Sequence, residues 1–221
     1  MEIDKIYNQD CLVGLAGIPD KGVDLVLTDI PYGGVNREDN GLRNLDKGAA
    51  DVCSFDVGEL TRTLCKKTRG SIYMFCGWGQ ISTIYENMAG GGLSTRLIIW
   101  EKTNPSPMNG ENIWLSGIEC CVYGKRGGAT FNGFCKNSVL RYPSCKSEIH
   151  PTQKPVELFG ELIAISSNEG DLVLDPFMGS ATTAIACLKM RRHFIGFELD
   201  REFYEKAQER IRIEQSEPLL F

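Results

Sequence analysis

The sequence predicts an α/β fold in which a doubly wound, mostly parallel sheet carries helices on both faces. Short apolar runs alternate with helical patterns along the chain, as the strands and crossover helices of such a sheet do. The run Val23–Asp29 is apolar almost to its end, which is typical of a strand buried on both faces. We therefore expect about seven strands with helices between most of them.

The expected elements follow from these patterns and from glycine and proline breaks. Strands are expected at Lys5–Asn8, Val23–Asp29, Gly70–Cys76, Leu172–Asp175 and Phe194–Phe197, with Arg96–Trp100 and Ile118–Tyr123 paired as a hairpin around the loop 103–116. Helices are expected at Asp10–Ala16, Glu59–Thr68, Gln80–Met88, Val156–Ser167, Ser180–Lys189 and Arg201–Ile213. Segments 33–56 and 124–151 are expected to be loops, the first of them mobile, and Gln215–Phe221 a tail.

The length and composition of the chain limit the classes of protein to which it can belong. A chain of 221 residues favours one domain, and 42% hydrophobic residues are enough for a sizeable core. No apolar run approaches the roughly 20 residues of a membrane helix, and the N-terminus lacks the apolar segment of a signal peptide. We expect a cytoplasmic protein. The net charge of −5 argues mildly against a protein dominated by nucleic-acid electrostatics, but it leaves room for a local basic cleft.

The cysteines and histidines give no sign of a metal site. None of the nine cysteines forms a C-x-x-C pair, and the two histidines lack the ligand spacing of zinc sites. We expect no metal, and we expect the cysteines that lie in apolar stretches to behave as small hydrophobic core residues. These are Cys65, Cys76, Cys120, Cys121 and Cys187.

The first motif, Asp29-Ile30-Pro31-Tyr32, lies just past the carboxyl end of a buried strand, the edge where open α/β sheets bind ligands. Its residue types fit chemistry on an amino nitrogen whose lone pair is delocalised into an aromatic ring. The Asp29 carboxylate and the Ile30 carbonyl can accept the two N–H groups, and Pro31 stiffens the loop. The Tyr32 ring can stack on a base flipped out of its duplex. Alone, the four residues also fit an ordinary strand-to-turn junction.

The second motif, Leu174–Thr183 (LDPFMGSATT), follows a strand and opens a helix. Gly179 allows a ligand to approach the backbone, and the hydroxyls of Ser180, Thr182 and Thr183 can cap a helix whose N-terminus favours a carboxylate. About 20 residues further on, a strand ends in Glu198, whose carboxylate can bind the ribose hydroxyls of a nucleoside cofactor. The alternative is an ordinary strand-to-helix turn with a surface glutamate.

The third motif, His150–Leu158 (HPTQKPVEL), precedes the helix that leads to the second motif. Two prolines hold the segment extended and then start the helix. Lys154 could pair with a cofactor carboxylate. His150 is expected to be a structural hydrogen-bonding residue rather than a catalytic base, because transfer from a sulfonium releases a neutral product and needs little help from a base.

With these three motifs, the chain resembles the amino-group DNA methyltransferases of the β arrangement, which methylate N6 of adenine or N4 of cytosine. In that family the catalytic loop precedes the cofactor motif, with the H-P-T-Q-K-P segment between them, and the same order is present here from Tyr7 to about Arg210. The resemblance implies a Rossmann-like, seven-stranded methyltransferase sheet with a circularly permuted motif order, whose central strands come from both ends of the chain. It also implies S-adenosyl-L-methionine as cofactor and DNA as substrate.

The resemblance assigns roles to residues of this sequence. The catalytic loop is Asp29, Ile30, Pro31 and Tyr32. The cofactor-binding residues are Asp10, Cys11, Asp29, Lys154, Asp175, Phe177, Gly179, Ser180, Thr182 and Glu198. Asp10 would approach the cofactor adenine, although it also fits a helix cap, and Lys154 would lie near the methionine carboxylate. The chain departs from the family in two places: Ile30 stands where proline is usual, which puts the rigidity of the loop in doubt, and Ala181 replaces a glycine, which is expected to crowd the cofactor slightly.

The chain is short for this family, so we expect a single methyltransferase domain (1–221) with a minimal target-recognition region at 103–149. The charged DNA-binding candidates lie in the loops 33–56, 103–116 and 124–149: Arg37, Arg43, Lys125, Arg126, Lys136, Arg141 and Lys146, with Phe131, Phe134 and Tyr142 as aromatic companions. Each charge also fits a solvated surface loop. So small a region predicts relaxed specificity or help from a second copy or subunit, in a restriction-modification or phage setting.

The favoured reaction is methylation of adenine N6, because N4-cytosine enzymes commonly carry serine at the position of Asp29. Two alternatives remain open: N4-cytosine methylation on the same scaffold, and a weakly active DNA-binding subunit in which Ile30 and Ala181 mark decay. The catalytic loop alone also fits an RNA or protein-glutamine target.

Overall fold

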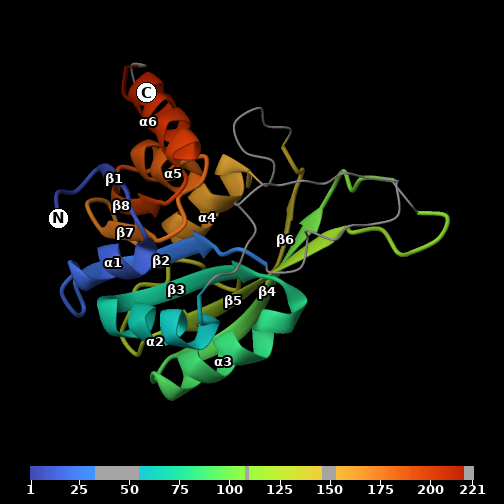
Figure 1. Cartoon of the computed structure of the whole chain (residues 1–221). Helices are drawn as coiled ribbons and strands as arrows, with labels where there is room; N and C mark the ends of the chain where they lie inside the picture. Colours follow the sequence, from blue (N-terminus) through green and yellow to red (C-terminus); the bar gives the residue numbers. More distant parts are fainter. Residues whose placement is uncertain (33–54, 108–109, 146–152, 217–221) are drawn as a thin grey trace.

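The structure, a computed structural model, describes residues 1–32, 55–107, 110–145 and 153–216. One sheet forms its centre, with strand order β1-β8-β7-β2-β3-β5-β4-β6 (Figure 1). The strands are β1 (Lys5–Asn8), β2 (Val23–Asp29), β3 (Thr68–Cys76), β4 (Ser94–Lys102), β5 (Ile118–Lys125), β6 (Val139–Tyr142), β7 (Leu172–Asp175) and β8 (His193–Glu198). In the described part, only β5 runs against its neighbours. β2 lies beside β7, so strands from the two ends of the chain meet in mid-sheet, as the permuted order implied.

The helices cover both faces of the sheet, which confirms the doubly wound arrangement (Figure 1). They are α1 (Cys11–Ala16), α2 (Val57–Lys67), α3 (Ile81–Gly90), α4 (Val156–Ser166), α5 (Thr182–Lys189) and α6 (Arg201–Ser216), with a short 3₁₀ turn, η2 (Trp78–Gln80), before α3. Helices α1, α2 and α3 pack on one face, and α4, α5 and α6 pack on the other.

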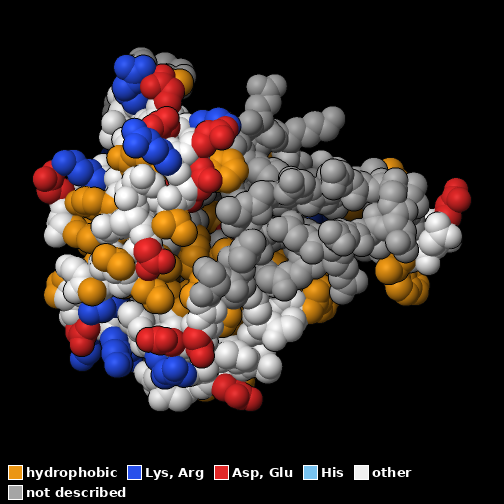
Figure 2. All heavy atoms as spheres, in the orientation of Figure 1, with side chains coloured by type: hydrophobic (Ala, Val, Ile, Leu, Met, Phe, Trp, Pro, Cys, Tyr) orange, Lys and Arg blue, Asp and Glu red, His pale blue; other side chains and the backbone are white. Residues whose placement is uncertain are grey.

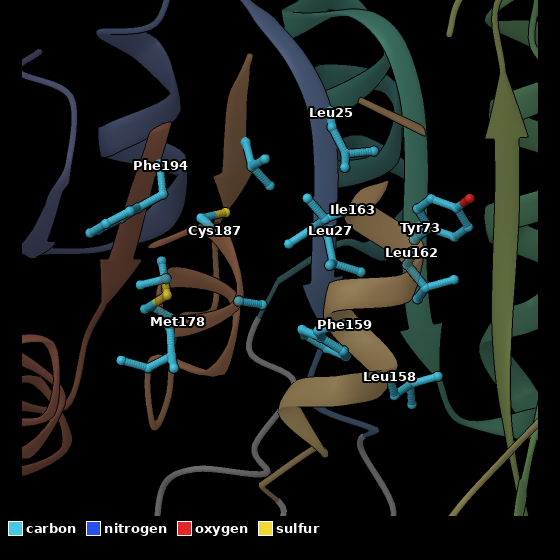
Figure 3. Packing of buried hydrophobic residues seen from close by; sticks show 14 of the residues in the cluster. Leu25, Leu27, Tyr73, Leu158, Phe159, Leu162, Ile163, Met178, Cys187 and Phe194 are labelled. Carbon is cyan, nitrogen blue, oxygen red and sulfur yellow. The ribbon is translucent and has the colours of Figure 1, made fainter. Parts of the chain in front are cut away.

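Two hydrophobic clusters, one on each face, hold these layers together. Leu25 and Leu27 of β2 pack with Phe159 of α4 and Cys187 of α5 (Figure 3), while Val26 between them faces the opposite cluster. Successive side chains of a strand point to opposite faces, so an uninterrupted apolar run is required where both faces are covered. The apolar sequence of β2 thus places Asp29 at the end of a strand that is held rigidly from both sides.

Three differences from the expected elements have local causes. The segment 124–151, expected to be a loop, contains β6, so the described sheet has eight strands. β6 has four residues, includes Arg141 and forms the sheet edge, so it lacks the apolar run of a buried strand. Helix α5 begins at Thr182 rather than Ser180, because Ala181 adopts a left-handed backbone conformation. Helix α6 continues to Ser216, so Gln215 and Ser216 are helical rather than part of a tail.

The cysteines expected in the core are buried: Cys65, Cys76, Cys120, Cys121 and Cys187. Cys11 is buried as well. Across the described ranges, no helix is both long and apolar enough to cross a bilayer.

Candidate active site

A cavity of about 600 Å³ opens at the edge of the sheet where the parallel strands end. Residues that follow β1, β2, β7 and β8 form its wall, together with the first residues of β5. Every residue that was expected to be catalytic or to bind cofactor lines it. These residues are Asp10, Cys11, Asp29, Ile30, Pro31, Tyr32, Lys154, Asp175, Phe177, Gly179, Ser180, Thr182 and Glu198. The fold therefore brings the three motifs together at one place.

Asp29, the last residue of β2, is surrounded by polar partners. Its Oδ2 forms an ion pair with Lys154 Nζ, and its Oδ1 accepts a hydrogen bond of 3.0 Å from the Tyr32 hydroxyl. Lys154 is only 4% exposed. Its ammonium also lies 5.5 Å from the centre of the Tyr32 ring, within the range of a cation–π contact. The catalytic-loop acid and the lysine of the third motif are thus direct neighbours, although 125 positions separate them.

Glu119, near the start of β5, completes this group and was missed from the sequence. Its Oε2 lies 3.0 Å from Lys154 Nζ and accepts a 3.0 Å hydrogen bond from the Tyr32 hydroxyl. Its Oε1 lies 2.8 Å from Lys102 Nζ at the end of β4. We call Asp29, Lys102, Glu119 and Lys154 the charge cluster; Tyr32 bridges its two acids.

The protonation of the charge cluster follows from burial and from its ion pairs. Burial opposes the ionisation of Glu119, but the ammonium groups of Lys154 and Lys102 prevail and lower its pKa to about 2. Burial raises the pKa of Asp29; Glu119 adds to this shift and Lys154 opposes it. Burial also works against the charge on Lys154, yet Asp29 and Glu119 raise its pKa. Lys154 and Glu119 are therefore both charged at neutral pH, and Asp29 is a stronger base than an exposed aspartate.

The catalytic loop is anchored by its neighbours. The Ile30 side chain is 2% exposed and packs in the cluster beneath α1 and α2, and its N–H donates to the Phe75 carbonyl of β3 at 3.2 Å. The Pro31 carbonyl accepts a 2.9 Å hydrogen bond from the Gln80 amide. Core packing and these two hydrogen bonds restrain the loop at Ile30, the position next to Pro31 where the resembled family usually has another proline.

The other half of the cavity has the features of a nucleoside site. Glu198, at the end of β8, accepts from the Gly179 N–H at 2.8 Å and from the Asp200 N–H at 2.9 Å. Each carboxylate oxygen has one further lone pair to offer to a hydroxyl group. Burial raises the pKa of Glu198, and the two backbone N–H groups partly offset this shift. Gly179 has a φ of 51°, in the left-handed region that glycine tolerates best.

Asp10 and Gln9 close this side of the cavity. Asp10 caps α1, since its Oδ1 accepts from the Leu12 N–H at 2.8 Å and from the Val13 N–H at 3.2 Å. The cap reading of Asp10 is confirmed, while its carboxylate also lines the cavity. The buried Gln9 Nε2 has no hydrogen-bond partner among the described residues. A buried amide donor that faces a cavity is costly unless a ligand atom accepts from it.

The hydroxyls of the second motif do not cap α5. Thr183 donates to the buried Asp175 carboxylate, and Thr182 donates to the Lys154 carbonyl at 3.3 Å. Ala181 occupies the N-cap position with φ 63° and a fully buried side chain. Its methyl group packs in the core and is not part of the cavity lining, so the structure does not support the expected crowding of a cofactor.

Two of the DNA-binding candidates lie away from the cavity. Because β5 runs antiparallel to β3, Lys125 and Arg126 lie at the opposite end of the sheet. The Arg126 guanidinium donates to the backbone carbonyls of Cys65, Thr68 and Gly91, so it ties α2, β3 and α3 together. We correct the expectation for this pair: the role of Arg126 is structural.

The remaining candidates divide between described and undescribed segments. Arg141 pairs with Glu101 at 3.0 Å near the cavity end of β6, and Lys136 pairs with Glu161 of α4. Both basic side chains stay at least half exposed. Arg37, Arg43, Lys146 and His150 lie outside the described residues.

The tip of the β4–β5 hairpin, which extends away from the body in Figure 1, carries an apolar group that was not anticipated. Trp114 is 95% exposed, and Ile113 and Leu115 beside it are also exposed. Figure 2 shows hydrophobic side chains at this end of the molecule. The available sequence signal was a tryptophan between two aliphatic residues within the expected loop 103–116. Elsewhere in the described ranges, no group of three or more His, Cys, Asp or Glu is arranged to hold a metal ion.

Comparison with known proteins agrees with this geometry. The sequence model of a DNA methylase family, N6_N4_Mtase, matches residues 108–209. The chain is also 29% identical over 235 residues to the Type II methyltransferase M.HpaI of Haemophilus parainfluenzae, covering 94% of this chain and 74% of that protein. The chain is thus similar to the amino-group DNA methyltransferases. It is also 25% identical to the Type II methyltransferase M2.DpnII of Streptococcus pneumoniae, over 95% of its own length and 90% of the relative.

A solved structure shows the same fold. The chain superposes on the crystal structure of the M1.HpyAVI–SAM complex with a TM-score of 0.74 and 27% identity, covering 94% of this chain and 98% of the other. The agreement extends over nearly the whole of both chains.

Proposed function

We propose that this methyltransferase transfers the methyl group of S-adenosyl-L-methionine to the exocyclic N6 of adenine in DNA. The observation that carries the proposal is that Asp29 and Tyr32 share one cavity with Gly179 and Glu198. A site for an amino group and a site for a nucleoside thus open into the same space of about 600 Å³, which suits a ligand of that size.

The residues of the cavity fit this cofactor. The Glu198 carboxylate would accept from the ribose hydroxyls, and the unpartnered Gln9 Nε2 would donate to a purine nitrogen. The N-terminus of α5 would face the methionine carboxylate. We no longer assign that carboxylate to Lys154, because its ammonium is held between Asp29 and Glu119. The bound cofactor supplies an electrophilic methyl group on a positively charged sulfur.

Asp29 is the residue that acts on the substrate nitrogen in this proposal. Its carboxylate accepts one amino N–H, which pulls the nitrogen toward a tetrahedral geometry and frees its lone pair to form the bond to carbon. The Ile30 carbonyl remains the proposed acceptor of the second N–H. Because burial raises the pKa of Asp29, its carboxylate can also hold the proton that the nitrogen gives up.

The test combines a variant with product analysis. We expect Asp29→Ala to abolish methyl transfer to DNA while S-adenosylmethionine still binds, measured by radiolabel transfer and by isothermal titration. Asp20→Ala, an exposed acid in the turn before β2, is the matched control and should remain active. Transfer by the Asp29 variant at the wild-type rate would contradict the role of Asp29, and a wild-type protein that does not bind the cofactor would contradict the proposed function.

The base is identified by digesting the methylated DNA to nucleosides. N6-methyladenosine is the expected product, since an aspartate begins the catalytic loop. N4-methylcytosine is the second candidate, because the matched family includes both kinds of enzyme by name. Detection of N4-methylcytosine would make cytosine, rather than adenine, the substrate base. The residues of the proposed site would stay the same.

We also propose that DNA is recognised by the region 103–149, at the cavity end of the sheet. Two observations support it: Lys102 and Glu119, at the base of the β4–β5 hairpin, line the cavity, and the hairpin extends from the body (Figure 1) with Trp114 exposed at its tip. Arg141 and Lys136 remain the proposed basic contacts of this region. The region is small, so a second copy or another subunit remains the proposed means of completing recognition.

A further inference from the structure

We propose that Glu119 is a positioning residue that balances the charge of the charge cluster, holding Lys154 and Tyr32 beside Asp29 so that the site can accept a cationic cofactor. This inference rests on the proposed function. Glu119 lies on β5, outside the three motifs, and its part in the site is visible only in the folded chain.

The contacts of Glu119 place it at the centre of the charge cluster. Its two oxygens contact Lys102 at 2.8 Å, Lys154 at 3.0 Å and the Tyr32 hydroxyl at 3.0 Å. Lys154 and Tyr32 are the two side chains that also contact Asp29. Without Glu119, both would have Asp29 as their remaining partner in the cluster, and the carboxylate that must accept a substrate N–H would be drawn further toward Lys154.

The charges of the cluster cancel. Asp29 and Glu119 contribute two negative charges, and Lys102 and Lys154 contribute two positive charges. All four side chains are at most 20% exposed, so water screens them weakly. Replacing Glu119 by glutamine keeps the size and polarity of the side chain but leaves the charge cluster with one net positive charge.

A charge cluster with one net positive charge should discriminate between two ligands that differ by one charge. S-adenosylmethionine has a positive sulfur, whereas S-adenosylhomocysteine lacks the methyl group and has a neutral sulfur. An excess positive charge in the same cavity repels the first ligand and not the second. A loss of packing or of loop order would instead weaken both ligands alike, so the ratio of their dissociation constants separates a charge role from a merely structural one.

The experiment measures the affinities of both ligands by isothermal titration calorimetry. We expect Glu119→Gln to weaken S-adenosylmethionine about tenfold more than S-adenosylhomocysteine. Lys102→Met, which leaves one net negative charge, should shift the ratio in the opposite direction. The double variant with both changes is neutral again and should return the ratio toward that of the wild type. Glu86→Gln, an exposed acid on α3, is the control and should leave the ratio unchanged.

The outcomes separate this inference from the proposed function. A ratio that stays at the wild-type value in Glu119→Gln, or that the double variant fails to restore, overturns the inference. Thermal melting shows whether Glu119→Gln folds. If it does not fold, the opposite shift in the ratio of dissociation constants that is expected of Lys102→Met still tests the inference. Methyl transfer to DNA by the wild type is measured in parallel. Its absence would overturn the proposed function, whereas transfer with an unchanged ratio would overturn the charge role of Glu119 alone.

Discussion

Ala181 shows how one residue can satisfy two opposing demands. Its backbone lies in the left-handed region at φ 63°, where an alanine costs about 1–2 kcal/mol more than a glycine. Its methyl group is fully buried in the cluster with α4 and α5, and burial of such a group contributes about 0.8 kcal/mol. The alanine also reduces the entropy of the unfolded chain relative to glycine. The three effects nearly cancel.

We therefore expect Ala181→Gly to change the free energy of unfolding by less than about 1 kcal/mol, measured by urea denaturation. The affinity for S-adenosylmethionine should stay at the wild-type value, because the methyl group does not line the cavity. Ala181→Val is the contrasting variant. A β-branched side chain in the left-handed region should be strongly destabilising. A several-fold gain in cofactor affinity for the glycine variant would show that the methyl group does crowd the ligand.

Asp175 should make stability depend on pH. Burial raises the pKa of its carboxyl from 3.8 to about 6, against the opposing hydrogen bonds from Thr183, Thr28 and the Phe177 N–H. A carboxyl with a higher pKa in the folded state binds its proton more tightly there. The folded chain therefore gains stability as pH falls through about 6 toward 3.8, and it loses this gain as pH rises again.

Relative to Asp175→Asn, the wild type should gain up to about 3 kcal/mol of unfolding free energy between about pH 7 and pH 4. Urea denaturation of both proteins across that range measures the difference, in which contributions from the other carboxyl groups largely cancel. A difference that does not vary with pH would mean that the Asp175 pKa is near its ordinary value in the folded chain.

At the scale of elements, the two ends of β5 have different roles, one in the active-site cavity and one in holding other elements together. Glu119 at its start joins the charge cluster, and Arg126 just past its other end donates to three backbone carbonyls. These carbonyls belong to the C-terminal ends of α2 and α3 and to the start of β3. A guanidinium at two helix C-termini also interacts favourably with both helix dipoles.

Arg126→Met should therefore lower the free energy of unfolding by about 2 kcal/mol, since hydrogen bonds from a charged donor are lost. Lys125→Met removes the same charge at the neighbouring position, where the ammonium donates only to the Arg126 carbonyl in the described structure. That control should cost less than about 0.5 kcal/mol. Neither change should weaken DNA binding in a gel-shift assay, and a clear loss of affinity at unchanged stability would return the pair to the DNA-binding surface.

The sequence predicts helices and strands better than it predicts which of them lie side by side in the fold. Local patterns were sufficient for β2, β7 and α4, because β2 and β7 are apolar runs that end in an acid, and α4 is a largely apolar helix that follows a proline. Glu119 could not be found in this way. It is an acid in a short apolar strand, and nothing in the sequence distinguishes it from an acid on the surface. Only the pairing of β5 with β3 and β4 brings it to Lys102 and Lys154.

At the scale of the whole molecule, the motifs were sufficient to predict which residues form one site. The carboxyl ends of parallel strands meet at the same edge, so Asp29, Asp175 and Glu198 had to lie near each other once their strands were assigned. The partners of each side chain were harder to predict. Lys154 binds two acids rather than a cofactor group, because chain regions far apart in sequence converge at the buried cavity.

The distribution of charge is also a property of the whole molecule. On the face shown in Figure 2, basic and acidic side chains are interspersed, in keeping with a net charge of −5. Most lysines and arginines of the described residues that make side-chain contacts pair with a nearby acid, as Lys67 does with Asp20 and Arg69 with Asp24. Among the described residues of this face, charges of both signs therefore largely offset each other.

The pairing of β1 with β8 has a consequence for the order in which the molecule can be built. Lys5 through Asn8 find their partners at Ile195 through Glu198, so nearly the whole polypeptide must leave the ribosome before the first strand has a neighbour. Parallel pairing over such a distance closes a long loop, so we expect it to be a slow step of folding. Asp10 and Glu198 line the same cavity only after that step. A nascent chain that stalls before β8 carries the catalytic loop but has no place for the nucleoside.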